Sequence, residues 1–258
     1  MSETPLLQVR GLTRRFGARL GCGDVSFDLW PGEVLGVVGE SGSGKTTLLR
    51  CLSGGLAADA GAVWFDTSAG GARDVLAMPE PERRMLARTD WAFVHQNPRD
   101  GLRMGVSAGG NVGERLMAVG GRHYGRIRAA AEDWLARVEI DAARIDEPPR
   151  AFSGGMQQRL QIARNLVTGP RLVFMDEPTG GLDVSVQARL LDLMRGLVRG
   201  MGLSAVVVTH DLAVVRLLAQ RLLVMKDGHV VEAGLTDQVL DDPQHPYTQL
   251  LVGSVLQV

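Results

Sequence analysis

The sequence predicts an α/β fold built on a mainly parallel β-sheet. First, short apolar stretches typical of buried strands alternate along the chain with stretches of helical periodicity. Second, a glycine-rich loop at Gly39–Thr46 separates an apolar stretch at Val34–Val38 from a helical pattern. Third, several apolar stretches end in polar residues, as parallel strands do where a ligand binds at their carboxyl ends.

The chain before residue 98 is predicted to be rich in strands. Leu6–Phe16 predicts an edge strand, Val25–Leu29 its partner, and Pro31-Gly32 a turn. The elements predicted next are a buried strand at Val34–Val38, a helix from Thr46, a strand at Ala62–Asp66, a loop at Ser68–Arg73, an exposed helix at Pro79–Arg88 and a strand at Trp91–Val94.

The composition changes after residue 98. Gly101–Gly113 is rich in glycine, and helical patterns follow at Arg115–Val119 and Tyr124–Ile140. Pro148-Pro149 interrupts them, and Arg159–Leu166 is helical again. We therefore predict a helical insert over residues 98–165 in a chain that otherwise alternates strands and helices.

The remainder of the chain returns to that alternation. The predicted strands are Leu172–Met175, Leu203–Val208 and Arg221–Met225, the predicted helices are Val184–Arg199 and Leu212–Leu218, and a helical region begins at Asp237. An Asp-Gly step at Asp227-Gly228 favours a hairpin turn.

Composition excludes several classes of function. With 28 basic and 29 acidic residues in 258, the chain has no electrostatic signature of nucleic-acid binding. Cys22 and Cys51 have no metal-ligand spacing and are predicted to be free thiols. Residues 1–10 lack the apolar region of a secretory signal, and every apolar run is shorter than a membrane helix needs, so we expect a cytoplasmic protein.

Gly39–Thr46 matches the phosphate-binding pattern G-x-x-x-x-G-K-S/T. Its glycines let the backbone wrap an anion, and the N–H groups of the loop and the following helix face it. Lys45 is predicted to reach the terminal phosphates and Thr46 to ligate Mg²⁺. Lys45 and Lys226 are the two lysines among 28 basic residues, so a lysine inside this loop indicates a site that an arginine does not replace.

Four predicted strands end in groups suited to phosphate chemistry. The first of these strand ends leads into the phosphate-binding loop. The other three lead into Gln96, Asp176 with Glu177, and His210. If the strands are parallel, all four ends lie on one edge of the sheet. Asp176 can ligate Mg²⁺, Glu177 can polarise a water, Gln96 can bridge metal and water, and His210 can contact the γ-phosphate. Each of them alone also has a structural interpretation, such as a helix cap or a loop start.

Two further features are open to two interpretations from the residues alone. Ser153, Gly154 and Gly155 at a helix start form either a second anion cradle or an ordinary helix cap. Phe16 precedes the loop, and as an isolated aromatic residue it is interpreted as core rather than as a stacking partner for a base.

Together these motifs resemble those of ATP-binding-cassette ATPases. The matches are Walker A at Gly39–Thr46, Walker B at Leu172–Asp176 with Glu177 as its catalytic residue, the signature motif at Phe152–Met156 with Phe and Met for the usual Leu and Gln, the Q-loop at Gln96, the D-loop at Gly180–Asp183 and the switch histidine at His210. The resemblance implies a P-loop core, an antiparallel β subdomain and an inserted α-helical subdomain.

The resemblance also implies a head-to-tail homodimer with ATP between Walker A of one protomer and the signature motif of the other. The implied catalytic residues are Glu177, His210 and Gln96, and the implied Mg²⁺ ligands are Thr46, Asp176 and Gln96. The implied ATP contacts are Phe16, now as the adenine-stacking residue, Gly39, Ser41, Gly42, Ser43, Gly44, Lys45, Thr46 and Thr47, with Ser153, Gly154 and Gly155 acting in trans.

Within the family, the chain more closely resembles the ATPase component of bacterial carbon–phosphorus lyase systems, which break down phosphonates. Five stretches carry this resemblance: Val106–Leu116, His123–Gly125, Phe152–Val167, Met175–Leu193 and Asp241–Leu251. It implies soluble lyase subunits as partners, and we expect the insert to bear the partner surface.

The main alternative is the ATPase of a dipeptide or oligopeptide importer, with a membrane permease docking near Gln96–Glu114. Asp183–Gln187 and His245–Leu251 are similar there too. Against it, Gly180-Gly181 replaces the expected Ser-Ala, and such importers are expected to continue beyond Val258 with a cysteine-bearing extension. An ATP-gated scaffold with little turnover is a further alternative. A GTPase is not expected, because neither lysine lies in an Asn-Lys-x-Asp motif.

Overall fold

The structure of the chain is a computed structural model that describes residues 4–255. It confirms the predicted α/β class, with parallel strands, alternating helices and a separate antiparallel sheet. The chain forms two compact units, Met1–Arg84 with Gly202–Val258, and Met85–Met201. The boundary falls inside α2 (Glu80–Thr89). Within residues 4–255, none of the helices combines the length and the apolar character that a membrane crossing requires.

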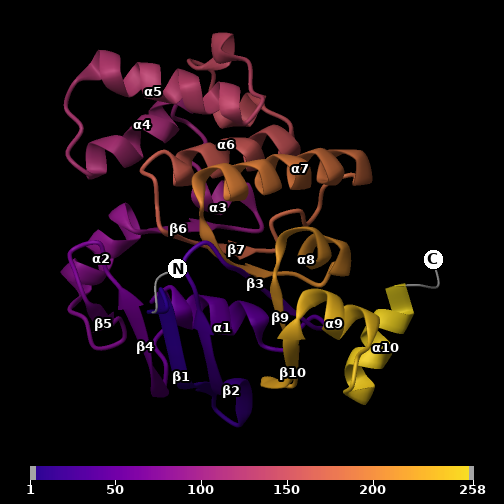
Figure 1. Cartoon of the computed structure of the whole chain (residues 1–258). Coiled ribbons are helices and arrows are strands. Elements are labelled where there is room, and N and C mark those ends of the chain that lie inside the picture. The colour runs from indigo at the N-terminus through magenta and orange to yellow at the C-terminus, as the bar shows by residue number, and fades with distance from the viewer. Residues whose placement is uncertain (1–3, 256–258) are drawn as a thin grey trace. The chain divides into compact units, whose positions relative to one another are not determined.

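The antiparallel sheet belongs to the first unit and has the strand order β2-β1-β4-β5 (Figure 1). Its strands are β1 (Leu7–Phe16), β2 (Arg19–Leu29), β4 (Ala60–Asp66) and β5 (Ala72–Asp74). The prediction of an edge strand at Leu6–Phe16 is wrong, because β4 pairs with the second side of β1, with Val9 opposite Val63. Residue alternation along β1 reveals its buried face but not how many of its sides are paired.

The parallel strands of the first unit surround β3 (Val34–Val38), whose five residues are all buried. β8 (Ser204–Val208) and β9 (Arg221–Lys226) pair with β3 in parallel, and β10 (His229–Leu235) returns antiparallel to β9. The predicted turn joins β9 to β10, with positive φ at Asp227 and Gly228. The helices of this unit are α1 (Lys45–Leu52), α8 (Leu212–Leu218), α9 (Thr236–Asp241) and α10 (Pro246–Val255).

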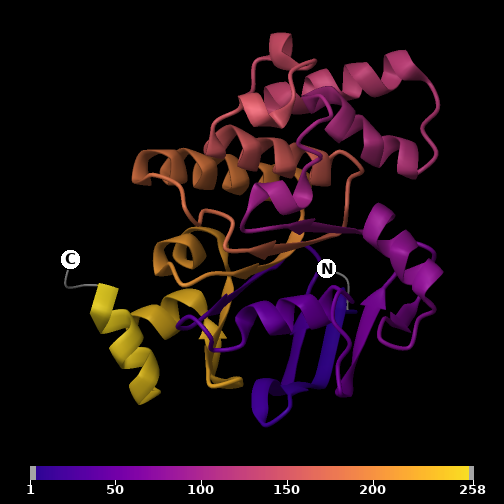
Figure 2. The same cartoon turned by 180° about the vertical axis from the view of Figure 1, so that it is seen from behind.

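The second unit contains the parallel pair of β6 (Trp91–Val94) and β7 (Leu172–Asp176). Trp91 packs edge-on against Phe174 across this pair, with ring centroids 5.4 Å apart. The helices of the unit are α3 (Pro98–Gly101), α4 (Ala108–Ala118), α5 (Tyr124–Arg137), α6 (Gly154–Leu166) and α7 (Val184–Met201), and single turns lie at Ala142–Arg144 and Pro149–Ala151 (Figure 2).

Helix α4 begins earlier than its glycine-rich sequence predicts. Ser107 caps it, because its hydroxyl accepts a hydrogen bond from the N–H of Gly110 at 3.1 Å. A Cβ on Gly109 would lie 2.5 Å from Cγ1 of Ile145, and one on Gly113 would lie 2.7 Å from Cγ2 of Ile127. Close helix packing therefore selects glycine here, against its low helix propensity. The predicted insert, residues 98–165, lies within the second unit, and its status as a separate subdomain stays a prediction.

Candidate functional site

The loop Gly39–Thr46 connects β3 to α1 through backbone that only glycine accommodates. Gly39 has φ 149° and Gly44 has φ 104°. A Cβ on Gly39 would collide with the carbonyl oxygen of Met225, and one on Gly44 with the carbonyl oxygen of Gly21. The loop is therefore pressed against the backbone of β9 and β2, which determines the path that its N–H groups follow.

Two buried polar side chains inside this loop fit a phosphate ligand. Lys45 is 5% exposed, and its Nζ donates to the carbonyl oxygens of Gly39 (2.7 Å) and Glu40 (2.8 Å). Ser43 is also 5% exposed, and its hydroxyl has no hydrogen-bond partner within residues 4–255. A buried hydroxyl without a partner is costly, and a phosphate oxygen would satisfy it. The ammonium and hydroxyl groups thus suit the phosphates predicted to bind here.

Phe16 lies at the end of β1 and is 46% exposed, so its interpretation as a core residue is wrong. A Cβ on Gly21 would lie 2.8 Å both from Cε2 of Phe16 and from Cγ2 of Thr47. Gly21 therefore lies next to both the Phe16 ring and the first turn of α1. The Arg14 guanidinium lies 5.0 Å from the centroid of the Phe16 ring. This position is compatible with the predicted stacking on a base.

His210 leaves the same sheet edge as the phosphate-binding loop. β3 and β8 are parallel, and Val37 lies opposite Val208. Gly39 comes two residues after Val37 and His210 two residues after Val208, so both leave the sheet at the same edge. His210 is exposed, and Asp211 after it caps α8 by accepting from the N–H of Ala213 at 2.9 Å. The prediction of a shared edge is confirmed for these two strand ends.

The second unit brings together Gln96, Asp176 and Glu177 in the same way. β6 and β7 are parallel with Val94 opposite Met175, so Gln96 and Glu177 follow at corresponding positions. Glu177 has φ 44°, and its carbonyl oxygen accepts from the N–H of Gly180 at 2.9 Å. A Cβ on Gly180 would lie 3.3 Å from Nε2 of Gln96, so the Gln96 side chain lies over this turn. Asp176 is 7% exposed.

The predicted second cradle lies at the N-terminus of α6, also in the second unit. The Ser153 hydroxyl accepts from the N–H of Met156 at 3.4 Å, which is the helix-cap interpretation. Ser153 and Gly154 are nevertheless exposed at the end of a 13-residue helix, where N–H groups favour an anion. A Cβ on Gly155 would lie 2.6 Å from Cγ1 of Val186, so Gly155 also allows α6 and α7 to approach.

The two departures from the usual signature sequence share one neighbour, Arg144. Its guanidinium lies 4.6 Å from the ring centroid of the buried Phe152 and donates to Sδ of Met156 at 3.3 Å. The same guanidinium pairs with Glu147 at 2.7 Å. Phe152 and Met156 therefore both pack against the Arg144 guanidinium, next to the N-terminus of α6.

The predicted Mg²⁺ donors are a hydroxyl on Thr46, a carboxylate on Asp176 and an amide on Gln96. Within residues 4–255, no group of three His, Cys, Asp or Glu side chains is arranged to hold a metal ion by itself. An oxygen donor set with one carboxylate suits Mg²⁺, which usually completes its coordination with substrate phosphates and water.

Sequence analysis missed three residues that contact these motifs. Tyr247 of α10 accepts from the N–H of Glu40 at 2.9 Å, and Arg19 Nη2 donates to the carbonyl oxygen of Gly42 at 3.5 Å. Gln161 of α6 bonds the backbone of His95, the residue before Gln96. Tyr247 lies 207 residues from Glu40 and Gln161 lies 66 from His95, and no local pattern signals such contacts.

Comparison with known proteins extends these observations over the whole chain. A family model described as ABC transporter matches residues 22–180. An Escherichia coli K12 protein with the provisional name phosphonates utilization ATP-binding protein PhnK is 68% identical over 253 residues, which are 98% of each chain. A Brucella melitensis protein provisionally named as a peptide import ATP-binding protein is 37% identical, over 99% of this chain and 79% of its own.

Two solved structures share the fold. One is the dimeric post-hydrolysis state of the ATP-binding cassette MJ0796 bound to ADP and phosphate, with a TM-score of 0.79, 27% identity, and coverage of 89% of this chain and 98% of that one. The other is cbiO1 from Clostridium perfringens, part of the ABC transporter complex cbiONQ, with a TM-score of 0.81, 25% identity, and coverage of 99% and 100%.

Proposed function

This chain belongs to the ABC transporter family, and on that premise we propose that it is a Mg²⁺-dependent ATPase acting as a head-to-tail dimer on the carbon–phosphorus lyase core complex in phosphonate breakdown. The observation that carries the ATPase assignment is the phosphate-binding loop, with its buried Lys45 and unsatisfied Ser43 hydroxyl. A cytoplasmic location is part of the same proposal.

Hydrolysis converts ATP and water to ADP and phosphate. Lys45 and the loop N–H groups hold the β- and γ-phosphates, and Phe16 stacks on the base. Thr46, Asp176 and Gln96 would hold Mg²⁺, which when bound neutralises charge on the phosphate oxygens. Glu177 orients the attacking water and accepts its proton, while His210 and Gln96 hydrogen-bond the γ-phosphate and its water.

The second half of each site is proposed to come from a second copy of the chain. Ser153 and Gly154 are exposed at the N-terminus of α6, so another protomer's phosphates can reach them. The related cassette with ADP and phosphate is dimeric, which supports the same arrangement here.

The phosphonate assignment is supported by the 68% identity to the E. coli phosphonates utilization protein over 98% of both chains. The importer alternative is supported by the 37% identity to the Brucella protein, and it requires a membrane permease as partner. The scaffold alternative differs only in turnover, and the presence of Glu177 after β7 and of His210 after β8 favours hydrolysis over it.

Turnover by Glu177→Gln tests the ATPase. We expect binding of ATP to persist and turnover to fall roughly 10²–10⁴-fold, because the amide cannot take the proton of the attacking water. The matched control is Glu132→Gln, which alters a half-buried glutamate on α5 that pairs with Arg128. Near-normal turnover in Glu177→Gln would refute the role of Glu177, and negligible turnover in the unaltered chain would favour the scaffold.

Capture of partners tests the rest. A tagged Glu177→Gln chain with ATP is used to recover proteins from the soluble and membrane fractions of its native cell, and Lys45→Ala serves as the nucleotide-free control. We expect soluble lyase subunits with the first variant and fewer with the second. Recovery of a polytopic membrane protein instead would assign the chain to the importers.

A further inference from the structure

The side chain of Gln161 binds the backbone of His95 at both of its polar groups. Oε1 of Gln161 accepts from the N–H of His95 at 2.6 Å, and Nε2 donates to the carbonyl oxygen of His95 at 3.0 Å. His95 follows the last residue of β6 and precedes Gln96. The amide thus pairs with the chain as a neighbouring strand would, just where the strand ends.

The same amide also lies against the other end of the segment that contains Gln96. A Cβ on Gly101, the last residue of α3, would lie 2.5 Å from Oε1 of Gln161. Gln158 adds a bond from Nε2 to the His95 carbonyl at 3.3 Å and accepts from Gln161 Nε2 at 3.1 Å. Gln161 is fully buried and Gln158 is 2% exposed, so breaking this cluster leaves buried polar groups without partners.

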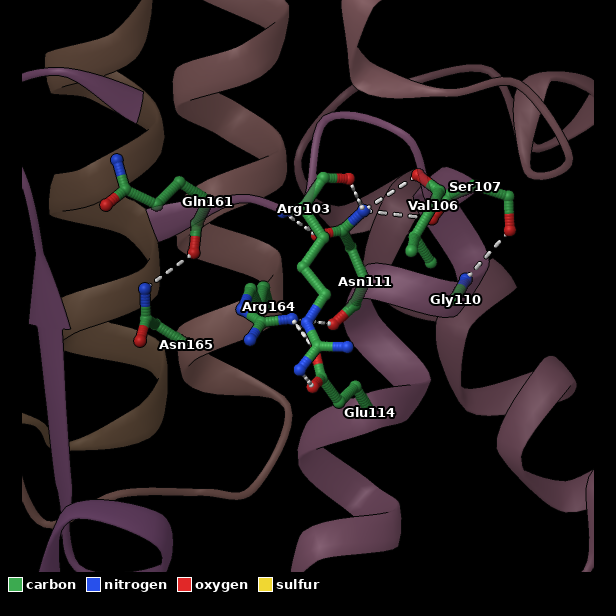
Figure 3. Close-up of polar contacts among 9 residues, drawn as sticks. All are labelled: Arg103, Val106, Ser107, Gly110, Asn111, Glu114, Gln161, Arg164 and Asn165. Atoms are coloured by element: carbon green, nitrogen blue, oxygen red, sulfur yellow. Dashed lines mark hydrogen bonds and ion pairs between the residues drawn. The ribbon is translucent and has the colours of Figure 1, made fainter. Parts of the chain in front are cut away.

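Gln161 stands seven residues after Gly154, which is about 10 Å along α6 from the helix start. One turn further along α6, Arg164 connects the helix to α4. Arg164 Nη1 donates to the carbonyl oxygen of Asn111 at 2.7 Å and pairs with Glu114 at 2.8 Å. Figure 3 shows Arg164 reaching toward α4 while the Gln161 side chain points to another side of α6. Helix α6 therefore joins its own N-terminus to the segment 95–101.

We infer that Gln161 is a positioning residue that holds Gln96 and the start of α6 as one body. Loss of the Gln161 amide is then expected to disturb the position of Gln96 and of the Ser153–Gly155 cradle together. The inference rests on the proposed function, because it assumes that Gln96 contacts the γ-phosphate site and that the cradle acts in trans.

The test compares Gln161→Met with a matched variant, Asn165→Leu. Methionine keeps the length of the side chain and removes both bonds to His95. Asn165 is also a buried amide on α6, but its bond runs to the carbonyl oxygen of Gln161 at 2.9 Å and not to His95 (Figure 3). Thermal unfolding first establishes that both variants fold. We expect Gln161→Met to lower kcat about tenfold or more at unchanged KM, and Asn165→Leu to keep kcat within about twofold.

A double-mutant cycle with Gln96→Ala separates positioning from general destabilisation. If Gln161 acts through Gln96, adding Gln161→Met to Gln96→Ala lowers kcat no further. In the Glu177→Gln background, Gln161→Met is also expected to weaken ATP-driven dimerisation, measured by light scattering.

Three outcomes would overturn the inference. If the kcat losses of Gln161→Met and Gln96→Ala multiply in the double variant, Gln161 does not act through Gln96. Equal kcat losses in Gln161→Met and Asn165→Leu would also refute the positioning role of Gln161. Neither result would affect the proposed role of Gln96. Unaltered turnover in Gln96→Ala alone would instead refute the role of Gln96 in the proposed function, and the inference would fail with it.

Discussion

The phenol oxygen of Tyr247 accepts a hydrogen bond of 2.9 Å from the backbone N–H of Glu40, the second residue of the phosphate-binding loop. Tyr247 is 6% exposed on α10, and its ring centroid lies 5.0 Å from Nζ of Lys226. Helix α10 thus supports the loop that begins at Gly39.

Replacing Tyr247 by phenylalanine keeps the ring and removes the acceptor for the Glu40 N–H. We expect a loss of about 1 kcal/mol in the free energy of unfolding and weaker ATP binding, because the loop is less well ordered. Thermal unfolding and ATP titration measure the two effects. Gln249→Met is the control, since its bond to the carbonyl oxygen of Pro243 lies within the C-terminal region. An unchanged ATP affinity would show that Tyr247 does not position the loop.

Glu232 anchors the chain before α10, where its carboxylate accepts from the N–H groups of Gln244 (2.8 Å) and His245 (3.0 Å). Burial raises the pKa of Glu232, but the Thr248 hydroxyl and these two N–H groups together lower it by more, so the net pKa is below the usual 4.5. Its contribution to stability is therefore present above about pH 4.5 and is lost as the pH falls through the lowered pKa.

The variant Glu232→Gln tests this pH dependence. We expect it to lower the free energy of unfolding at about pH 7 and to resemble the unaltered chain at about pH 3, as measured by denaturant titration. An equal loss at both pH values would mean that the charge of Glu232 contributes nothing.

The two lysines allow a matched test of the phosphate-binding loop. Lys45→Arg places a planar guanidinium where a 5% exposed ammonium bonds two carbonyl oxygens, and we expect ATP affinity to fall about tenfold or more in a folded chain. Lys226→Arg is the control, because its exposed cation lies over Tyr247 and arginine stacks there equally well. Equal ATP affinities in the two variants would contradict a narrow ammonium site.

Variants at Gly155 distinguish a role in helix packing from a role in contacting the nucleotide. Gly155→Ala adds a Cβ that would lie 2.6 Å from Cγ1 of Val186, and we expect a loss of roughly 1–3 kcal/mol in stability. Adding Val186→Ala removes that clash and restores stability. If Gly155 also faces ATP in trans, turnover stays low in the double variant. Full recovery of turnover would reduce Gly155 to a packing residue.

The sequence by itself determined the local elements and the chemistry that they carry. The apolar stretches at β3, β6, β7 and β8 and the polar residues after them follow from short-range patterns, so Gly39–Thr46, Gln96, Asp176-Glu177 and His210 were all predictable. Lys45 could be singled out because lysine is rare in this chain.

Only the tertiary structure decided what surrounds those residues. The pairing of both sides of β1, the exposure of Phe16, the helical glycines of α4 and the bonds of Tyr247 and Gln161 all depend on neighbours that are distant along the chain. The physical reason is that a residue's local pattern encodes its own backbone preference and burial. A hydrogen bond or a close approach depends equally on a partner whose position is determined by the packing of the rest of the chain.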